Sequence, residues 1–560
     1  MELMKRIFGF FYKETSVLQE AAYLLAFFSI LSQVFAFFRD RLLAYTFGAG
    51  SELDMYYAAF RIPDFLFVTV ASIVSISVIV PFIVEREHIG REAVRTFIDS
   101  IASFFSILII AISIAAFFAI PIFSETLFRG FSGAELSKVI LLSRIFLLSP
   151  ILLGFSNLIG ALTQAYNRFL VYAFAPVMYN VGIILGTLVL APHVGIYGVA
   201  WGVVIGAALH LLIQIPYVVK LGLMPRFKLF FNFESIRRVI GLSLPRTLTL
   251  STNHIATIFL ISFASLMATG SISIFSFSLN ISSVPLSIIG VSYSLAAFPT
   301  LSRYISKKNT EAFVKEMATT TRLIVFWSLP ATALFVVLRN QIVQVLLGTG
   351  RFDLNDTRLT AAALGLFSLS ILFQCLLLLF VRAFYAAGHT RKPFLINLVS
   401  TALLLGITYG FVHVAGQFPG FQTFVARVFG VDDLPSTAIL MLPLGYSVGT
   451  IINGLVHWVG FEIDYPGFTR QTGKTIIQSI VAGIVVGIIT HATLGVYGGW
   501  YEPMTIIGVF LKGLISGLVG IAAGLGVLAL MKSKDLRDIR QGISRKFFKK
   551  GIVAEDPKIV

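Results

Sequence analysis

Apolar stretches of about 20 residues recur along almost the whole chain, and this recurrence limits its fold more than any other feature. An α-helix needs about 20 apolar residues to cross the roughly 30 Å hydrocarbon core of a bilayer. About fourteen such stretches can be counted. The predicted spans cover residues 21–46, 57–84, 97–121, 139–165, 169–191, 195–219, 241–266, 272–302, 323–347, 358–387, 393–414, 437–461, 476–496 and 505–530.

The composition agrees with a chain that works inside a membrane. Of the 560 residues, 57% are hydrophobic and 12% are charged, against about 45–50% and about 25% in soluble globular domains. The connections between the apolar stretches are short, so no soluble domain of ordinary size fits between them. We therefore predict an all-α polytopic membrane protein.

The basic residues predict the orientation of the chain. With the N-terminus in the cytoplasm, the inside segments hold about 31 of the 43 Lys and Arg residues, and the outside loops about five. This asymmetry favours an even number of spans with both termini in the cytoplasm. The net charge of +16 then reflects topology and attraction to anionic lipid, so we expect no nucleic-acid partner.

The two ends of the chain carry interfacial patterns. Residues 1–20 have no signal-peptide cleavage site and mix aromatic with basic residues, which predicts a cytoplasmic or interfacial segment. Residues 531–560 form a basic amphipathic tail, either a positive-inside anchor or a partner site. The lone Cys375 excludes an internal disulfide and a cysteine-based metal cluster.

An internal repeat divides the chain. GSELDMYYAAFRIP in the first half is echoed by GSISIFSFSLNISSVP in the second, and further pairs follow at an offset of about 220 residues. Six spans are thus duplicated about an axis along the membrane normal, which is a transporter layout with a cleft between two bundles. The predicted parts are an N-lobe at 21–219, a linker at 220–240, a C-lobe at 241–461 and two additional helices at 476–530.

Three consecutive charged residues, Arg39, Asp40 and Arg41, lie near the end of the first span. A charge at membrane depth costs about 3 to 10 kcal/mol or more, so such charges are usually functional. Successive helical side chains point about 100° apart, which predicts that these three do not share a face. Asp40 and Arg61 lie at similar depth when counted from the turn that follows. We predict that one carboxylate there is an ion-pair partner that holds the arginines in place, and that Asp40 is the structural support of Arg39.

Other acidic residues near the helix ends have several possible roles. Asp64 can form a local ion pair with Arg61, three residues earlier. Asp54 is predicted at the rim, as a gate contact, a helix cap or a solvated side chain. Asp353 and Asp356 have the pattern of turn and N-cap residues.

Several motifs together resemble those of the MurJ (MviN) family of lipid II flippases, within the multidrug/oligosaccharidyl-lipid/polysaccharide exporter superfamily. They are FFRDRLLAYTFGAGSELDMYYAAFRIPDFL at 37–66, AYNRFLVYAFAPVMYN at 165–180, VPLSIIGVSYSLAAFPTLSR at 284–303, LLGTGRFDLNDT at 346–357 and VRAFYAAGHTRKPF at 381–394. The resemblance implies two six-span lobes, two extra helices that form a hydrophobic groove, and alternating access in a bacterial cytoplasmic membrane. The implied cargo is lipid II, a polyprenyl-pyrophosphate-linked peptidoglycan precursor, moved from the cytoplasmic to the outer leaflet by a chain that we expect to be monomeric.

Arg39 and Asp54 match charged residues of the family pattern, but other family arginines are missing. Gln33, Phe67 and Asn280 stand where the resemblance implies arginines. Arginine binds phosphate oxygens in pairs, so the remaining arginines are candidates to hold the pyrophosphate. The predicted substrate-binding residues are Arg39, Arg61, Arg41, Arg382, Arg144, Asn280 and Gln33, with Asp40, Asp54 and Asp64 as gating or ion-pair residues.

The energy source follows less directly from the residues. The predicted spans between 241 and 461 contain no Asp or Glu, so no carboxylate there can bind Na⁺ or relay a proton. Asn397 and Thr401 are weak candidates for a cation, and we predict no other metal site and no cofactor. The membrane potential is a further candidate, because moving one charge through about 100 mV is worth about 2.3 kcal/mol.

Three other functions stay open. The chain could export another lipid-linked glycan, or small molecules as other exporters of the superfamily do, although cationic drugs favour an acidic cavity. It could be an intramembrane glycosyltransferase, but no cluster of His, Asp or Glu in the sequence suggests metal or base chemistry. It could also be a scaffold or an inactive homologue. The leading prediction is a transporter and not an enzyme.

Overall fold

The computed structural model describes residues 18–71, 74, 76–228, 233–500 and 505–548, and these contain helices, turns and loops but no strand. The predicted all-α class is confirmed. The predicted N-terminal segment 1–20 lies almost wholly outside the described residues, as does the end of the tail.

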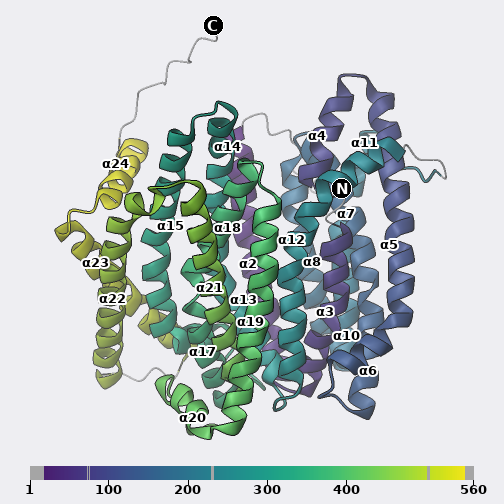
Figure 1. The fold of residues 1–560 in the computed structure, drawn as a ribbon. Helices are drawn as coiled ribbons and strands as arrows, with labels where there is room; N and C mark the ends of the chain where they lie inside the picture. Colours follow the sequence, from purple (N-terminus) through teal and green to yellow (C-terminus); the bar gives the residue numbers. More distant parts are fainter. Residues whose placement is uncertain (1–17, 72–73, 75, 229–232, 501–504, 549–560) are drawn as a thin grey trace. The chain divides into compact units, whose positions relative to one another are not determined.

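The helices follow one another with short connections (Figure 1). In the first part of the chain they are α2 (Leu18–Phe47), α3 (Ser51–Ala71), α4 (Ile76–Glu87), α5 (Arg91–Leu127), α6 (Gly133–Phe146), α7 (Leu148–Ala165), α8 (Phe169–Leu185), η1 (Gly186–Leu190), α9 (Ala191–Val194), α10 (Ile196–Leu212) and α11 (Ile215–Lys220). In the second part they are α12 (Phe233–Ser265), α13 (Ser271–Pro285), η2 (Leu286–Val291), α14 (Ser292–Ser306), α15 (Thr310–Val337), α16 (Arg339–Leu346), α17 (Leu354–Ser368), α18 (Ile371–Ala386), α19 (Arg391–Gln417), α20 (Pro419–Val428), η3 (Thr437–Leu440), α21 (Met441–Asp464), α22 (Phe468–Trp500), α23 (Ile506–Leu530) and α24 (Lys534–Phe548).

Ten helices among the described residues are long and apolar enough to cross a membrane, and the pair α17 and α18, bent by 45°, makes up to eleven. Each of these coincides with a predicted span. The three other predicted spans coincide with α2, with α3 followed by α4, and with α12, so the count of fourteen is not confirmed. The helix α3 does not qualify as a candidate span because it carries too many charges: Asp54, Arg61 and Asp64 lie within its 21 residues.

The chain forms two compact units. Unit 1 contains the described residues of 18–278, 346–363 and 390–449, and unit 2 those of 279–345, 364–389 and 450–548. These units do not follow the predicted lobes at 21–219 and 241–461, which therefore stay a prediction. The units are described separately below.

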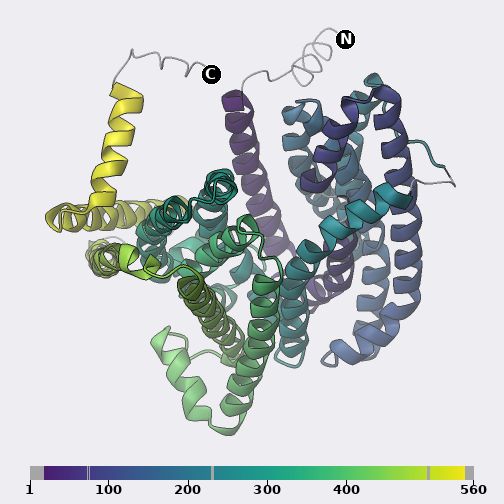
Figure 2. The same cartoon turned by 45° about the horizontal axis from the view of Figure 1, so that its top comes forward.

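In unit 1, glycines let the helices α8 and α10 approach closely, as small residues do in membrane proteins. A Cβ atom on Gly182 would lie 2.2 Å from the Cα atom of Gly206, and one on Gly186 would lie 2.4 Å from that of Gly202. A hydrophobic core in this unit is formed by apolar residues of α4, α5 and α7, among them Phe82, Phe97 and Phe105. Further along the chain, α19 and α20 form a hairpin (Figure 2).

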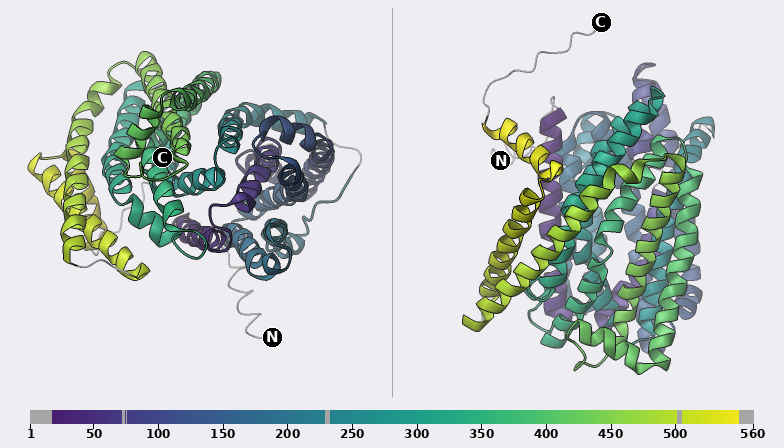
Figure 3. Two further views of the ribbon diagram at one scale, coloured as in Figure 1. Left: turned by 90° about the horizontal axis from the view of Figure 1, so that it is seen from below. Right: turned by 60° about the vertical axis from the view of Figure 1, so that its left-hand side comes forward.

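In unit 2, α22 packs against both α15 and α23 (Figure 3). Its core is rich in phenylalanine, with Phe313, Phe380 and Phe461 fully buried. The start of α24 is fixed by the buried Asp535, which accepts hydrogen bonds from Arg322 Nε at 3.2 Å and Thr475 Oγ1 at 2.6 Å. The first part of the predicted basic tail is thus a docked helix.

Candidate functional site

Arg39 in α2 is held in a fixed position by two neighbours. Its Nε and Nη2 atoms donate to Asp40 Oδ1 at 2.9 and 2.7 Å, and its Nη1 atom donates to Asn180 Oδ1 in α8 at 2.9 Å. The side chain of Arg39 is 20% exposed and that of Asp40 is 6% exposed. An arginine has five N–H groups, so two of them are left for a ligand.

The contact between Arg39 and Asp40 agrees with the prediction that Asp40 supports Arg39. The angle between successive side chains suggested that Arg39 and Asp40 do not share a face, yet they form an ion pair. The Cβ atoms do diverge, but the long arginine side chain bends back to the neighbouring carboxylate. Asp40 supports an arginine as predicted, and that arginine is Arg39.

Arg61 in α3 is hydrogen-bonded to Ser276 in α13, with 3.1 Å between its Nη2 atom and the serine Oγ atom. Its Nε atom is buried and has no hydrogen-bond partner among the described residues. The predicted Arg61–Asp40 ion pair is wrong, because Asp40 pairs with Arg39. Asp64 is close enough to Arg61 for their charges to attract, but its nearest charged or titratable contact is His254 in α12, with 3.2 Å between Asp64 Oδ2 and His254 Nδ1. Sequence spacing within α3 could not reveal the competing partner from α12.

Asp54 at the start of α3 is a buried helix cap for α13. Its carboxylate accepts hydrogen bonds from the backbone N–H groups of Gly270 and Ser273 at 2.6 and 2.7 Å, and from Ser273 Oγ at 2.6 Å. A carboxylate satisfies unpaired N–H groups at a helix N-terminus and interacts favourably with the helix dipole. Of the three roles predicted for Asp54, solvation is excluded and capping is confirmed.

Three loops meet around Asp54, and we call residues 47–51, 266–273 and 349–356 the outer loop cluster. Arg351 N donates to Tyr45 O at 3.0 Å, and Ala49 N donates to Asp356 Oδ2 at 3.1 Å. Gly270 has a positive φ of 91°, and a Cβ atom there would lie 2.3 Å from Ala49 O. In this cluster, backbone atoms of segments from both copies of the predicted repeat are therefore in direct contact.

The acidic residues of the third loop have the roles predicted for them. Asp353 Oδ1 accepts a hydrogen bond from Asp356 N at 2.8 Å, at the start of α17. Asp356 in turn bonds to Ala49, as described above. The turn and capping prediction is confirmed for Asp353, whereas Asp356 has an added contact with a distant loop.

The other predicted substrate-binding residues are spread over both units. Arg41 and Gln33 are half-buried in α2, and Arg144 donates from Nε to Phe117 O at 3.3 Å. In unit 2, Arg382 Nη1 donates to Ser294 Oγ at 2.5 Å, and Asn280 is half-buried in α13. Arg39 and Arg61 both remain in unit 1, on α2 and α3.

The weak cation candidates lie in α19, where Asn397 is buried and Thr401 is half-buried. Across the residues that the structure describes, no group of three or more His, Cys, Asp or Glu side chains could hold a metal ion. The cation role of these two residues stays a prediction.

Sequence reasoning did not identify the partners that orient the charged residues. Asn180, Ser276 and His254 are single polar residues in apolar helices, and they touch charges more than 100 positions away in the sequence. Asn180 is the last residue of the motif at 165–180, but its position in the sequence does not indicate that it contacts Arg39. Only the packing of α8 against α2 does so.

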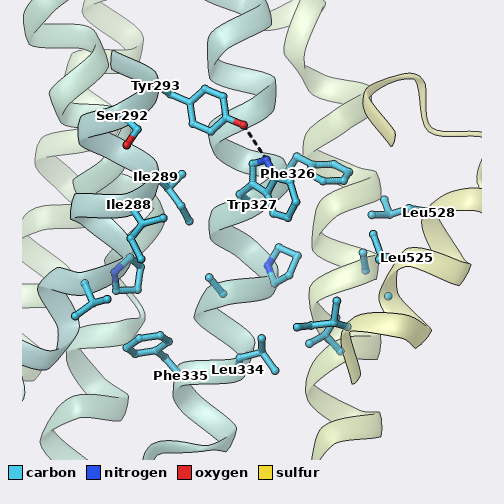
Figure 4. A pocket seen from close by; sticks show the side chains of 18 residues that line it. Ile288, Ile289, Ser292, Tyr293, Phe326, Trp327, Leu334, Phe335, Leu525 and Leu528 are labelled. Atoms are coloured by element: carbon cyan, nitrogen blue, oxygen red, sulfur yellow. Dashed lines mark hydrogen bonds between the residues drawn. The ribbon is translucent and has the colours of Figure 1, made fainter. Parts of the chain in front are cut away.

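Unit 2 contains an apolar pocket of about 640 Å³. It lies between the segment from α13 to α14 and the helices α15, α22 and α23, and Figure 4 shows its side chains. A polar contact at one side joins Trp327 Nε1, the donor, to Tyr293 Oη at 2.9 Å. The apolar lining includes Ile288, Phe326, Phe335, Leu525 and Leu528.

These features define a class of protein. Among the described residues, an all-helical chain with at least ten candidate spans, arginines held by hydrogen bonds on α2 and α3, and an apolar pocket has the architecture of a multi-span membrane transporter. The family model described as lipid II flippase MurJ matches residues 43–511. The chain therefore belongs to the MurJ family, whose members are flippases and not enzymes.

Individual relatives and solved structures agree with this assignment. The chain is 23% identical over 474 residues to the lipid II flippase MurJ of Burkholderia cenocepacia, covering 79% of this chain and 90% of that protein. It is 26% identical over 535 residues to a probable lipid II flippase MurJ of Vibrio cholerae, covering 91% and 95%.

The fold is similar to two kinds of solved transporter. A lipid II flippase MurJ in an inward closed conformation matches with a TM-score of 0.68 and 21% identity, covering 89% of this chain and 98% of that one. An inward-facing multidrug resistance transporter of the MATE family matches with a TM-score of 0.63 and 14% identity, covering 78% and 96%. The chain therefore has the all-helical transporter fold that these two structures share.

Proposed function

We propose that this protein moves lipid II from the cytoplasmic to the outer leaflet of a bacterial cytoplasmic membrane by alternating access. Membership of the MurJ family over residues 43–511 carries this proposal. It works as a monomer with both termini in the cytoplasm, which is the orientation that the basic residues predict.

Arg39 is the residue best suited to hold the pyrophosphate. Asp40 and Asn180 fix its guanidinium, so little side-chain freedom is lost when its two remaining N–H groups bind phosphate oxygens. Arg61, with its buried and unpartnered Nε atom, is a second candidate. Both arginines are charged at every physiological pH, so they bind the anion without a titration step.

The apolar pocket of unit 2 suits the isoprenoid tail. Its volume of about 640 Å³ is within the range of about 300–1,000 Å³ for ligand sites, and its lining is apolar apart from a few groups such as Tyr293 and Ser292. Burial of hydrocarbon stabilises such a complex by about 0.8 kcal/mol per CH₂ group relative to water, but by little relative to lipid. The pocket therefore acts by positioning the tail rather than by extracting it from the bilayer.

The outer loop cluster is the proposed outer gate. Asp54 contributes three hydrogen bonds to it, and these must break when segments 47–51 and 266–273 separate. Each such bond to a charged group is worth about 1.5–3 kcal/mol, which is enough to favour the closed arrangement but not to prevent opening.

The leaflet position of lipid II in cells tests the function. In cells depleted of this protein and lacking any other flippase, we expect lipid II to become inaccessible to an outer-leaflet probe. Wild-type protein restores accessibility, Arg39→Ala does not, and Arg61→Ala restores it partly. Normal accessibility after depletion would refute the proposed function, and full rescue by Arg39→Ala would refute only the assigned site.

A further inference from the structure

Arg144 lies in a second apolar pocket, which is lined by residues of α5, α6, α7 and α10. This pocket belongs to unit 1 and has a volume of about 640 Å³. Its lining includes Ile114, Phe117, Leu148 and Trp201, and large parts of these four side chains are exposed. A pocket on a surface that faces lipid is open to molecules that diffuse within the bilayer.

The guanidinium of Arg144 is only partly satisfied by the protein. Its Nε atom donates to Phe117 O at 3.3 Å, and its Cζ atom lies 4.3 Å from the centroid of the Phe117 ring. Within the described part of the chain, its terminal nitrogens have no hydrogen bond and no carboxylate partner. A cation among apolar side chains is costly unless an anion joins it, so the pocket favours a negatively charged ligand.

Ser113 is a second polar group that lacks a partner in this pocket. It is 6% exposed and lines the pocket, and its Oγ atom has no hydrogen-bond partner among the described residues. In contrast, Ser103 and Ser106 of the same helix donate to the carbonyl groups four residues earlier. Ser113 can therefore donate its hydroxyl proton to a ligand in the pocket.

The two polar groups lie at different depths. Arg144 follows the start of the predicted span 139–165 by five residues, about 8 Å, and helical side chains tilt toward the helix N-terminus, so Arg144 points toward the nearer membrane surface. Ser113 precedes Phe117 by four residues, about 6 Å along α5, and lies closer to the middle of the bilayer. In a glycerophospholipid the phosphate and the ester carbonyls follow the same order from surface to interior.

We propose that this pocket binds one anionic glycerophospholipid. Its phosphate lies against Arg144, an ester carbonyl accepts a hydrogen bond from Ser113, and an acyl chain occupies the apolar part beside Trp201. The predicted topology places this lipid in the outer leaflet. The site is an accessory lipid site and does not depend on the cargo that the protein moves.

Fluorescence quenching of Trp201 by brominated lipid tests the proposal. The full-length protein is reconstituted in phosphatidylcholine vesicles that contain increasing fractions of phosphatidylglycerol with brominated acyl chains. The contribution of Trp201, one of four tryptophans, is obtained by subtracting the signal of Trp201→Phe. We expect phosphatidylglycerol to be preferred over phosphatidylcholine by about fivefold, the factor for one basic residue near anionic lipid.

Variants test whether the preference for phosphatidylglycerol comes from this pocket. Arg144→Gln should abolish it and Arg144→Lys should retain most of it, whereas Arg129→Gln, which removes an exposed arginine near the outer end of α5, should leave it unchanged. If Arg144→Gln does not fold, Ile114→Phe should abolish the preference by filling the pocket from its exposed side.

Three results would overturn the proposal. The first is an equal preference in the wild type and in Arg144→Gln or Ile114→Phe. The second is equal quenching by brominated phosphatidylcholine and phosphatidylglycerol. The third is loss of the lipid signal when excess inorganic phosphate or an equimolar polyprenyl phosphate is added, because the pocket would then select a free anion or the polyprenyl group instead of the phospholipid.

Discussion

At the scale of single residues, the position of each charge is determined by its partner. Arg39 is held by Asp40 and Asn180, Asp64 by His254, and Asp54 by the backbone at the start of α13. An unpaired buried charge would cost several kcal/mol, so the contacts of the buried Asp40 and Asp54 offset a large desolvation penalty. In the proposed site, Gln33, Phe67 and Asn280 stand where the family resemblance implies arginines, so Arg39 is assigned a greater share of the binding.

The geometry of Arg39 makes a conservative substitution informative. Arg39→Lys keeps the charge but cannot bond to Asp40, Asn180 and a phosphate together, because an ammonium group lacks the planar fork. We expect the flipping rate to fall by about 10- to 100-fold, the equivalent of one lost charge-assisted hydrogen bond. The rate is measured as the appearance of fluorescent lipid II in the outer leaflet of proteoliposomes. Arg129→Lys is the control, and equal rates for the two variants would contradict the role of Arg39.

At the scale of helices, packing depends on small residues more than on specific polar contacts. The helices α8 and α10 cross at glycines with almost no space between the backbones. Large apolar side chains of α22 and α23, such as Ile484, Ile507 and Leu518, are exposed instead of packed between helices. Close backbone approach gains van der Waals contact, which is the main attraction between helices where lipid is as apolar as the protein.

Two glycine substitutions separate packing from helix propensity. Gly182→Ala would place a Cβ atom 2.2 Å from Gly206, and we expect it to lower the melting temperature in detergent by several degrees, since a displaced helix pair loses about 1–3 kcal/mol. Gly410→Ala in α19, where a Cβ atom meets nothing within 4 Å, should raise stability slightly, by about 0.5–1 kcal/mol. Thermal unfolding followed by intrinsic fluorescence measures both. A decrease of similar size in the two variants would argue against the packing explanation.

At the scale of the whole molecule, the distribution of charge bears on the energy source. The predicted spans between 241 and 461 contain no carboxylate, while the net charge is +16. If the transport cycle carries the charge of Arg39 or Arg61 through part of the membrane field, its rate depends on the membrane potential.

We therefore expect lipid II flipping in proteoliposomes to depend on voltage. Removal of a potential of about 100 mV with valinomycin and K⁺ should slow transport by up to about 50-fold if one full charge crosses the field. Replacement of Na⁺ by choline at constant potential should change the rate less than twofold, as expected for a protein without a sodium carboxylate. A loss of transport in choline with the potential intact would instead support a cation site near Asn397.

Local patterns in the sequence were sufficient for the class of this protein and for part of its site. Apolar stretches reveal membrane helices because the bilayer imposes one length and one polarity on every span, and Arg39 stands out because a charge at membrane depth is rare. The tertiary structure decided which groups meet. Asn180 reaches Arg39, Ser276 reaches Arg61 and His254 reaches Asp64 only because helices distant in the sequence pack together. The same packing places Arg144 beside Ser113 in a lipid-facing pocket, a juxtaposition that depends on three-dimensional contact and leaves no periodic pattern in the chain.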